Sequence, residues 1–115
     1  MTRHDPIVRL QHMLDYAREA VQMAEGRTRA DLGRDRLLNL SLVRLLEMVG
    51  EAAARVPRDC RERWSGIPWP EIVGLRNRLI HGYDDVDLDI LWTIIQDDLP
   101  PLIAELSRIL DDAQS

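Results

Sequence analysis

Apolar residues recur at alternating steps of three and four in three long stretches of this 115-residue chain, and this spacing restricts the fold more than any other feature. Residues spaced in this way lie on one side of an α-helix, because the helix has about 3.6 residues per turn. The stripes are, in chain order, Ile7, Leu10, Leu14, Ala17, Val21 and Ala24; then Leu38, Leu42, Leu45, Val49, Ala52 and Val56; then Leu88, Leu91, Ile95, Leu99, Leu102, Leu106 and Ile109. No segment has the apolar–polar alternation typical of a strand. The sequence therefore predicts an all-α protein.

Capping residues and prolines set the expected ends of the first helices. Asp5 can cap the first helix and Gly26 can end it. The second helix is expected from about 31 to 55, since Pro57 cannot continue it. A short helical turn is expected over 58–63.

A glycine and an aspartate mark the expected end of the third helix and the expected start of the fourth. A third helix is expected over 70–80, because a proline at its start presets the helical backbone and Gly82 can close it. Asp87 can cap the fourth helix. Pro100-Pro101 should kink that helix or split it near Asp97, because proline lacks an amide donor.

Length and composition favour one domain. Residues 1–115 should form a single antiparallel four-helix bundle with a possible extra short helix, because a chain of this size buries one core. The one cysteine, Cys60, cannot form an internal disulfide, and the N-terminus lacks the apolar segment of a secretory signal. No apolar run approaches the roughly 20 residues that span a bilayer. We expect a cytoplasmic protein without membrane association.

The charges are distributed unevenly along the chain. A net charge of −5 argues against indiscriminate binding to nucleic acid, which depends on neutralising phosphates. Residues 55–81 nevertheless hold six arginines and three acidic residues, whereas residues 82–115 hold one arginine and nine acidic residues. All fifteen basic residues are arginine, which either genomic base composition or phosphate binding would explain.

Arg76 is the residue that the helical pattern does not explain. On a continuous third helix it falls in the middle of the apolar face. That face comprises Ile72, Val73, Leu75, Leu79 and Ile80. An unpaired charge in such a place is strongly unfavourable. Arg76 therefore either pairs with a carboxylate such as Glu51 or Asp98, reaches past its neighbours to water, or belongs to a functional site.

The residues after Arg76 could complete such a site. Asn77 and His81 are four residues apart and would share the polar face of a continuous helix, with Arg78 beside them. A histidine can shuttle the protons and an arginine can stabilise the phosphorane, as RNA cleavage without a metal requires. The structural alternatives are that His81 caps the helix end and that Tyr83 is an ordinary loop tyrosine.

Arg76, His81 and Tyr83 together match Arg-x4-His-x-Tyr. In this respect the chain resembles HepT-type members of the HEPN superfamily, whose signature is Arg-x(4–6)-His-x-Tyr. The resemblance covers nearly the whole chain. Further segments that look like the family's pattern are Val49-Gly50-Glu51-Ala52-Ala53, Ile67-Pro68-Trp69, Ile90-Leu91-Trp92 and Asp98-Leu99-Pro100.

The resemblance implies a HEPN-like helical homodimer in which two motifs face a cleft between the subunits. It also implies the toxin of a type II toxin–antitoxin pair, acting on RNA as an endoribonuclease without a metal or other cofactor. Arg76 would bind and polarise the phosphate, and His81 would act as general acid and base. Asn77 would orient the site, and Arg78 and Tyr83 would support it.

The resemblance further implies a nucleotidyltransferase antitoxin that transfers AMP from ATP to Tyr83. The added phosphate would place negative charge in the RNA-binding cleft. Tyr83 runs directly into Asp84-Asp85-Val86-Asp87, whose carboxylates would repel RNA. Either RNA reaches the cleft from the arginine side, or the chain is mainly a regulatory partner and AMP acceptor. A purely structural helical dimer is the third hypothesis.

Overall fold

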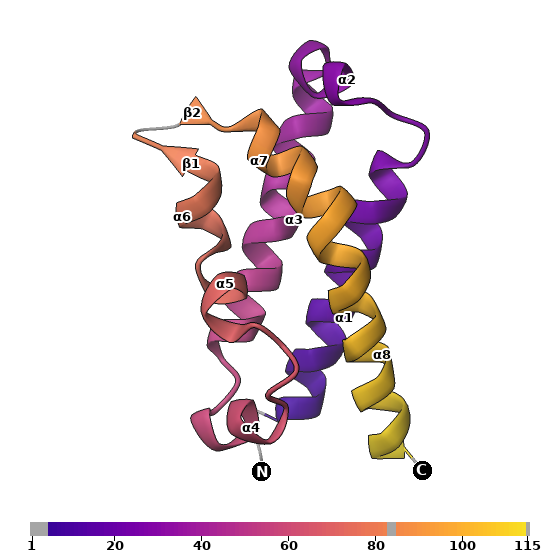
Figure 1. Ribbon diagram of the computed structural model, residues 1–115, viewed down its shortest axis with the longest axis vertical. Helices are drawn as coiled ribbons and strands as arrows, with labels where there is room; N and C mark the ends of the chain where they lie inside the picture. The colour runs from indigo at the N-terminus through magenta and orange to yellow at the C-terminus, as the bar shows by residue number, and fades with distance from the viewer. Residues whose placement is uncertain (1–4, 83–84, 115) are drawn as a thin grey trace.

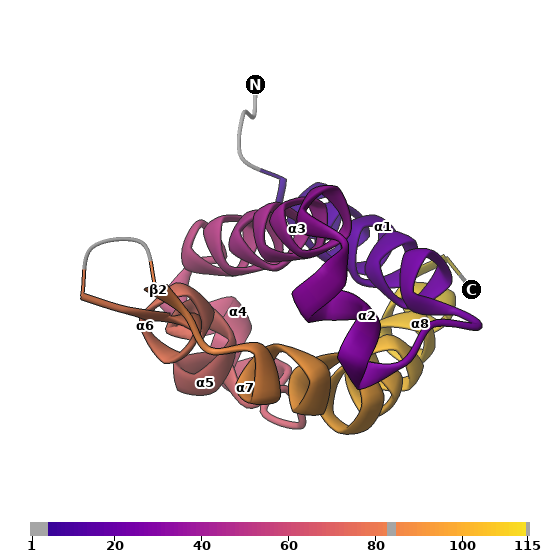
Figure 2. The same cartoon turned by 90° about the horizontal axis from the view of Figure 1, so that it is seen from above.

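The computed structural model describes residues 5–82 and 85–114, which form an up-down-up-down bundle of helices (Figures 1 and 2). The bundle's four sides are α1, α3, the pair α5 and α6, and the continuous run α7, η1 and α8. The elements are α1 (Pro6–Ala24), α2 (Arg29–Arg34), α3 (Arg36–Ala54), α4 (Arg58–Arg63), α5 (Trp69–Val73), α6 (Leu75–Leu79), β1 (Ile80–His81), β2 (Asp85–Val86), α7 (Leu88–Thr93), the π-helix η1 (Ile94–Asp98) and α8 (Leu99–Gln114). The predicted all-α class is confirmed.

The first predicted helix is confirmed, and the second is divided in two. Asp5 caps α1 by accepting a hydrogen bond from the amide of Ile7 at 3.0 Å. The predicted helix over 31–55 is instead α2 followed by α3, because Asp35 between them is extended. Its side chain accepts a hydrogen bond from the amide of Leu38 at 3.0 Å and starts α3. The predicted helical turn over 58–63 is confirmed as α4.

The third predicted helix, over 70–80, is wrong as a continuous element. It breaks at Gly74 into α5 and α6, and Ile80 is already extended. β1 and β2 form an antiparallel pair in which Ile80 lies opposite Val86 and His81 lies opposite Asp85. No strand was predicted, because two residues are too few to show an alternation. Gly82 has φ +68°, a left-handed conformation that glycine adopts without steric cost.

The fourth predicted helix is interrupted where the prolines require it. The run changes from α-helix to the π-helix η1 at Ile94 and returns to α-helix at Leu99. The amide of Leu99 bonds to the carbonyl of Ile94, a five-residue step. Pro100 and Pro101 have no amide hydrogen, so carbonyls in the preceding turn lose their usual donors. The change of helix type falls near Asp97, where a kink or split was predicted, but the run stays helical and is not split.

The core consists mainly of aliphatic side chains from all four sides of the bundle, and no polar or charged side chain of residues 5–82 and 85–114 is buried. Gly50 in α3 fixes how closely α5 approaches, since a Cβ atom there would lie 3.0 Å from the carbonyl oxygen of Ile72. This close approach seats the helix pair that carries the motif directly against α3. In the part of the chain that the structure describes, no helix is long and apolar enough to cross a membrane.

Candidate functional site

Helix α6 turns Arg76 away from the core. Leu75 and Leu79, four residues apart, are 1% and 0% exposed and hold α6 against the bundle. Arg76 lies on the other side, and 63% of its side chain is exposed. The prediction of Arg76 within an apolar face is therefore wrong. Val73 is likewise 37% exposed, so the buried face of α5 and α6 is narrower than the predicted one and comprises Ile72, Leu75 and Leu79.

A carboxylate from α3 holds Arg76. Its Nε donates to Oε2 of Glu47 at 3.0 Å, and the other oxygen of Glu47 lies 3.4 Å from Nη1 of Arg44. Neither of the predicted partners is correct. Glu51 contacts Arg44 at 3.3 Å, and Asp98 contacts a different arginine. Nη1 and Nη2 of Arg76 make no hydrogen bond or ion pair within the described residues, so these donors remain available to an anion.

Asn77 lies next to Arg76 at the same hollow, which has a volume of about 250 Å³. The wall from α3 includes Glu47 and Gly50. Asn77 is exposed, as is Arg76. Arg76 and Asn77 therefore line the same hollow. At Gly50 the α3 side of this hollow presents backbone without a side chain.

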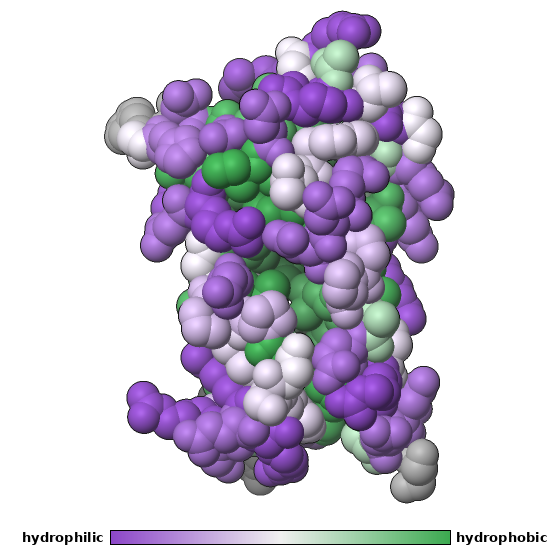
Figure 3. Space-filling view, in the orientation of Figure 1, coloured by the Kyte–Doolittle hydropathy of each residue, from purple (hydrophilic) through white to green (hydrophobic). Residues whose placement is uncertain are grey.

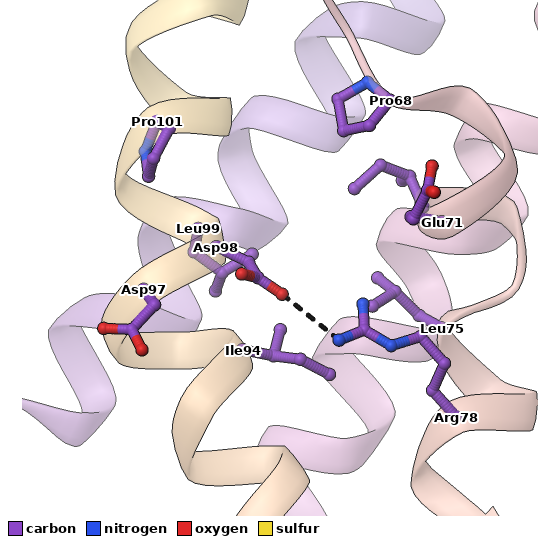
Figure 4. Close-up of a pocket in the computed structure, with 10 residues that line it drawn as sticks. Pro68, Glu71, Leu75, Arg78, Ile94, Asp97, Asp98, Leu99 and Pro101 are labelled. Atoms are coloured by element: carbon purple, nitrogen blue, oxygen red, sulfur yellow. Dashed lines mark hydrogen bonds and ion pairs between the residues drawn. The ribbon is translucent and has the colours of Figure 1, made fainter.

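Arg78 faces a second pocket, on the side of α6 toward η1 and α8 (Figure 4). Its Nη2 lies 3.3 Å from Oδ2 of Asp98. The pocket has a volume of about 390 Å³ and an apolar lining that includes Leu75 and Ile94. Figure 3 shows apolar atoms at the bottom of this hollow. The predicted position of Arg78 beside Asn77 and His81 is therefore wrong.

His81 lies in β1, outside the helix. Because α6 ends at Leu79, His81 neither caps the helix nor shares a helical face with Asn77, and both predictions are wrong. The side chain of His81 is 56% exposed, and its Nε2 lies 3.3 Å from Oδ2 of Asp87. In the described ranges 5–82 and 85–114, no hydrogen bond or ion pair joins Arg76 to His81. Tyr83 lies outside the described residues.

Asp87 is held from several directions. Its Oδ1 accepts a hydrogen bond from the amide of Ile90 at 3.0 Å and caps α7, as predicted. Its own amide donates to the carbonyl of Leu79 at 2.8 Å. The bond from Ile90 and, next, the one from His81 hold the pKa of Asp87 below its usual value, although partial burial opposes this shift. Asp87 is therefore an anchored carboxylate in contact with the motif histidine.

Sequence reasoning missed the roles of Glu47 and Asp87. Glu47 is 29 residues from Arg76, and nothing local signals their contact. The contact of Asp87 could have been found from the sequence. A glycine after His81 allows a hairpin turn, and such a turn can bring the side chains of residues six apart, here His81 and Asp87, into contact. No group of three or more His, Cys, Asp or Glu side chains within the described residues could hold a metal ion.

The helical bundle and the Arg-x4-His motif define a HEPN-type all-α protein. Residues 13–109 match the model of the family described as "Ribonuclease HepT-like". The chain belongs to the HepT-like ribonuclease family.

Relatives of similar length support this assignment. A "Probable ribonuclease HepT" of Thermococcus cleftensis is 33% identical over 95 residues, which cover 79% of this chain and 86% of the relative. A protein of Caldanaerobacter subterraneus subsp. tengcongensis named "Putative RNase" is 36% identical over 101 residues, covering 88% and 90% of the two chains. Another protein with that designation, from Methanocaldococcus jannaschii, is 31% identical over 109 residues, covering 95% of this chain and all of the relative. No solved structure matches the chain significantly.

Proposed function

We propose that this protein is an endoribonuclease that cleaves RNA without a metal ion. One observation carries the proposal: in a HepT-like chain, two donors of the motif arginine have no partner among the described residues, while the motif histidine contacts a fixed carboxylate. Nη1 and Nη2 of Arg76 would bind a phosphate, and Asn77 at the same hollow would orient it. His81 would transfer the protons.

The reaction needs one proton taken up and one delivered. His81 in its neutral form removes the proton of the ribose 2′-OH, and the 2′-oxygen attacks the adjacent phosphorus. Arg76 stabilises the negative charge of the phosphorane. The bond between phosphorus and the 5′-oxygen then breaks, and this oxygen takes a proton from His81 in its protonated form. The products are a 2′,3′-cyclic phosphate and a 5′-hydroxyl.

The active form would be a homodimer in which motifs of two chains face one cleft. Among the described residues Arg76 and His81 contact different carboxylates and not each other, which supports this proposal, because a phosphate held by Arg76 could then meet the histidine of the second copy.

Cleavage of a labelled single-stranded RNA in a buffer with a chelator tests the proposal. Arg76→Ala and His81→Ala should each lower kcat/KM by about a hundredfold or more, because general acid–base catalysis and phosphate stabilisation contribute on that order. His12→Ala is the matched control, since His12 lies on α1 with its ring packed near Tyr16. Equal cleavage by all variants would reject the proposal and leave His81 a structural residue.

We further propose that the chain is the toxin of a toxin–antitoxin pair and that a nucleotidyltransferase antitoxin transfers AMP to Tyr83. The position of Asp85 opposite His81 favours the alternative in which this chain is mainly an AMP acceptor, because the carboxylate repels RNA. Intact-mass measurement after incubation with the antitoxin and ATP distinguishes the outcomes. A gain of one AMP that Tyr83→Phe abolishes supports modification at Tyr83; a gain that persists in Tyr83→Phe contradicts it.

A further inference from the structure

A single aspartate at the start of α7 joins three parts of the molecule. Oδ1 of Asp87 caps α7, its amide donates to the carbonyl at the end of α6, and Oδ2 contacts His81 in β1. The cap uses one carboxylate oxygen, so the contact with His81 is additional to it. A helix cap alone would be satisfied by serine or asparagine, and neither supplies a negative charge to the histidine.

We propose that Asp87 is a positioning residue that fixes the ring of His81 through Nε2 and leaves Nδ1 as the nitrogen that exchanges protons with RNA. The inference rests on the proposed ribonuclease function and concerns the same site. When Nε2 carries the hydrogen donated to the carboxylate, Nδ1 of the neutral ring holds the lone pair that a base needs. After His81 takes up a proton, the carboxylate stabilises the resulting imidazolium.

The surroundings make Asp87 rigid enough for this role. Its side chain is 31% exposed, whereas that of His81 is 56% exposed, so the carboxylate is the more fixed member of the pair. The short pair of β1 and β2 sets the distance between them. The lowered pKa of Asp87 keeps its carboxylate charged at neutral pH.

The contact with the ring distinguishes Asp87 from nearby aspartates whose carboxylates would only repel RNA. Asp85 lies opposite His81 in the strand pair and is exposed, and Asp89 is bound by Arg29 at 2.6 Å. Within the described ranges neither of these two carboxylates contacts the histidine ring, so they would act on RNA only through their charge. Among the carboxylates that the structure describes, Asp87 is the one that contacts the ring.

The experiment compares Asp87→Asn and Asp87→Ser, both of which retain a cap for α7, with wild type and His81→Ala. Each Asp87 variant should lower kcat by about tenfold to a hundredfold and leave KM within about twofold. In a His81→Ala background, Asp87→Asn should cause no further loss, because Asp87 acts through His81. A variant that instead lowers KM and raises kcat/KM would show that Asp87 only repels RNA, and would overturn the proposal.

A readout independent of RNA keeps this proposal separate from the proposed function. In ¹⁵N-edited NMR spectra, the Nε2 hydrogen of His81 should exchange with water at least about tenfold faster in Asp87→Asn than in wild type, because the variant lacks the carboxylate that accepts this hydrogen. This result would support the positioning role even if wild type cleaves no RNA. Unchanged exchange would contradict it. Asp35→Asn is the matched control: Asp35 caps α3 and pairs with Arg27 at 2.7 Å, so its loss tests a cap and ion pair outside the motif.

Discussion

Each basic side chain in residues 76–81 is held by a carboxylate from a different part of the chain. Arg76 contacts Glu47 of α3, Arg78 contacts Asp98 of η1, and His81 contacts the residue that caps α7. These pairs are partly exposed, and such pairs contribute little to stability, typically about 0–1 kcal/mol each. Their main effect is to set where the cations point and how much positive charge an RNA phosphate meets.

If Arg76 binds a phosphate as proposed, Glu47 should compete with that phosphate for the guanidinium. Replacing Glu47 with Gln removes a negative charge 3.0 Å from Nε of the arginine. Glu47→Gln should therefore tighten binding of single-stranded RNA by about two- to fivefold at low salt, with a smaller effect at high salt. Fluorescence anisotropy with labelled RNA measures this change, using catalytically inactive His81→Ala as the common background.

Glu51→Gln provides the comparison for Glu47→Gln, because Glu51 lines the same hollow but forms its ion pair with Arg44 and not with Arg76. An equal effect of both substitutions would indicate a general charge effect of α3. Weaker binding by Glu47→Gln would show that the carboxylate orients Arg76 more than it competes.

At the scale of elements, the contact between α3 and α5 positions the motif. Gly50 allows this contact, since an added Cβ would lie 3.0 Å from a backbone carbonyl. α5 and α6 are each five residues long, too short to be stable alone, so packing against α3 holds them. A disturbance at Gly50 should therefore reach Arg76 through the displaced helix pair.

Substitutions at two helical glycines test this dependence. Gly33→Ala in α2 meets only a side-chain atom at 3.8 Å, and should stabilise the protein by up to about 1 kcal/mol because alanine favours helix. Gly50→Ala has the same helical gain but crowds the carbonyl of Ile72, so its melting temperature should be several degrees below that of Gly33→Ala. Differential scanning calorimetry compares the two. Equal melting temperatures would contradict the close-approach role of Gly50.

At the scale of the whole molecule, the net charge of −5 leaves few favourable contacts for RNA. Binding should therefore depend on a small number of arginines and on whether motifs from two chains meet. The number of phosphates neutralised is measurable as the slope of log affinity against log salt concentration.

Arg76→Ala measures this number directly. The slope for single-stranded RNA should become less steep by roughly 0.7 if one arginine meets each RNA, and by roughly 1.4 if two motifs share it. Light scattering on the same samples reports the oligomeric state. A dimer with a change of roughly 1.4 supports a shared cleft; a monomer with a change of roughly 0.7 contradicts it.

The sequence alone determined the helical class, most helix ends and the residues of the motif. These features are local: stripes of apolar residues, an aspartate before a helix, and two prolines that force η1 all act within a few residues. The same pattern predicted one continuous third helix with Arg76 on its apolar face, because periodicity reports neither the break at Gly74 nor which apolar residues of the face stay exposed.

Only the tertiary structure decided which carboxylate meets each cation of the motif. Arg76 and Glu47 are 29 residues apart, and Arg78 and Asp98 are 20 apart, so their contacts depend on how α3 and η1 pack against α6. The contact of His81 with Asp87 spans six residues but requires a turn at Gly82 and a strand pair too short to appear as a pattern. Spacing along the chain fixes which residues share an element, whereas packing between elements fixes which charges meet.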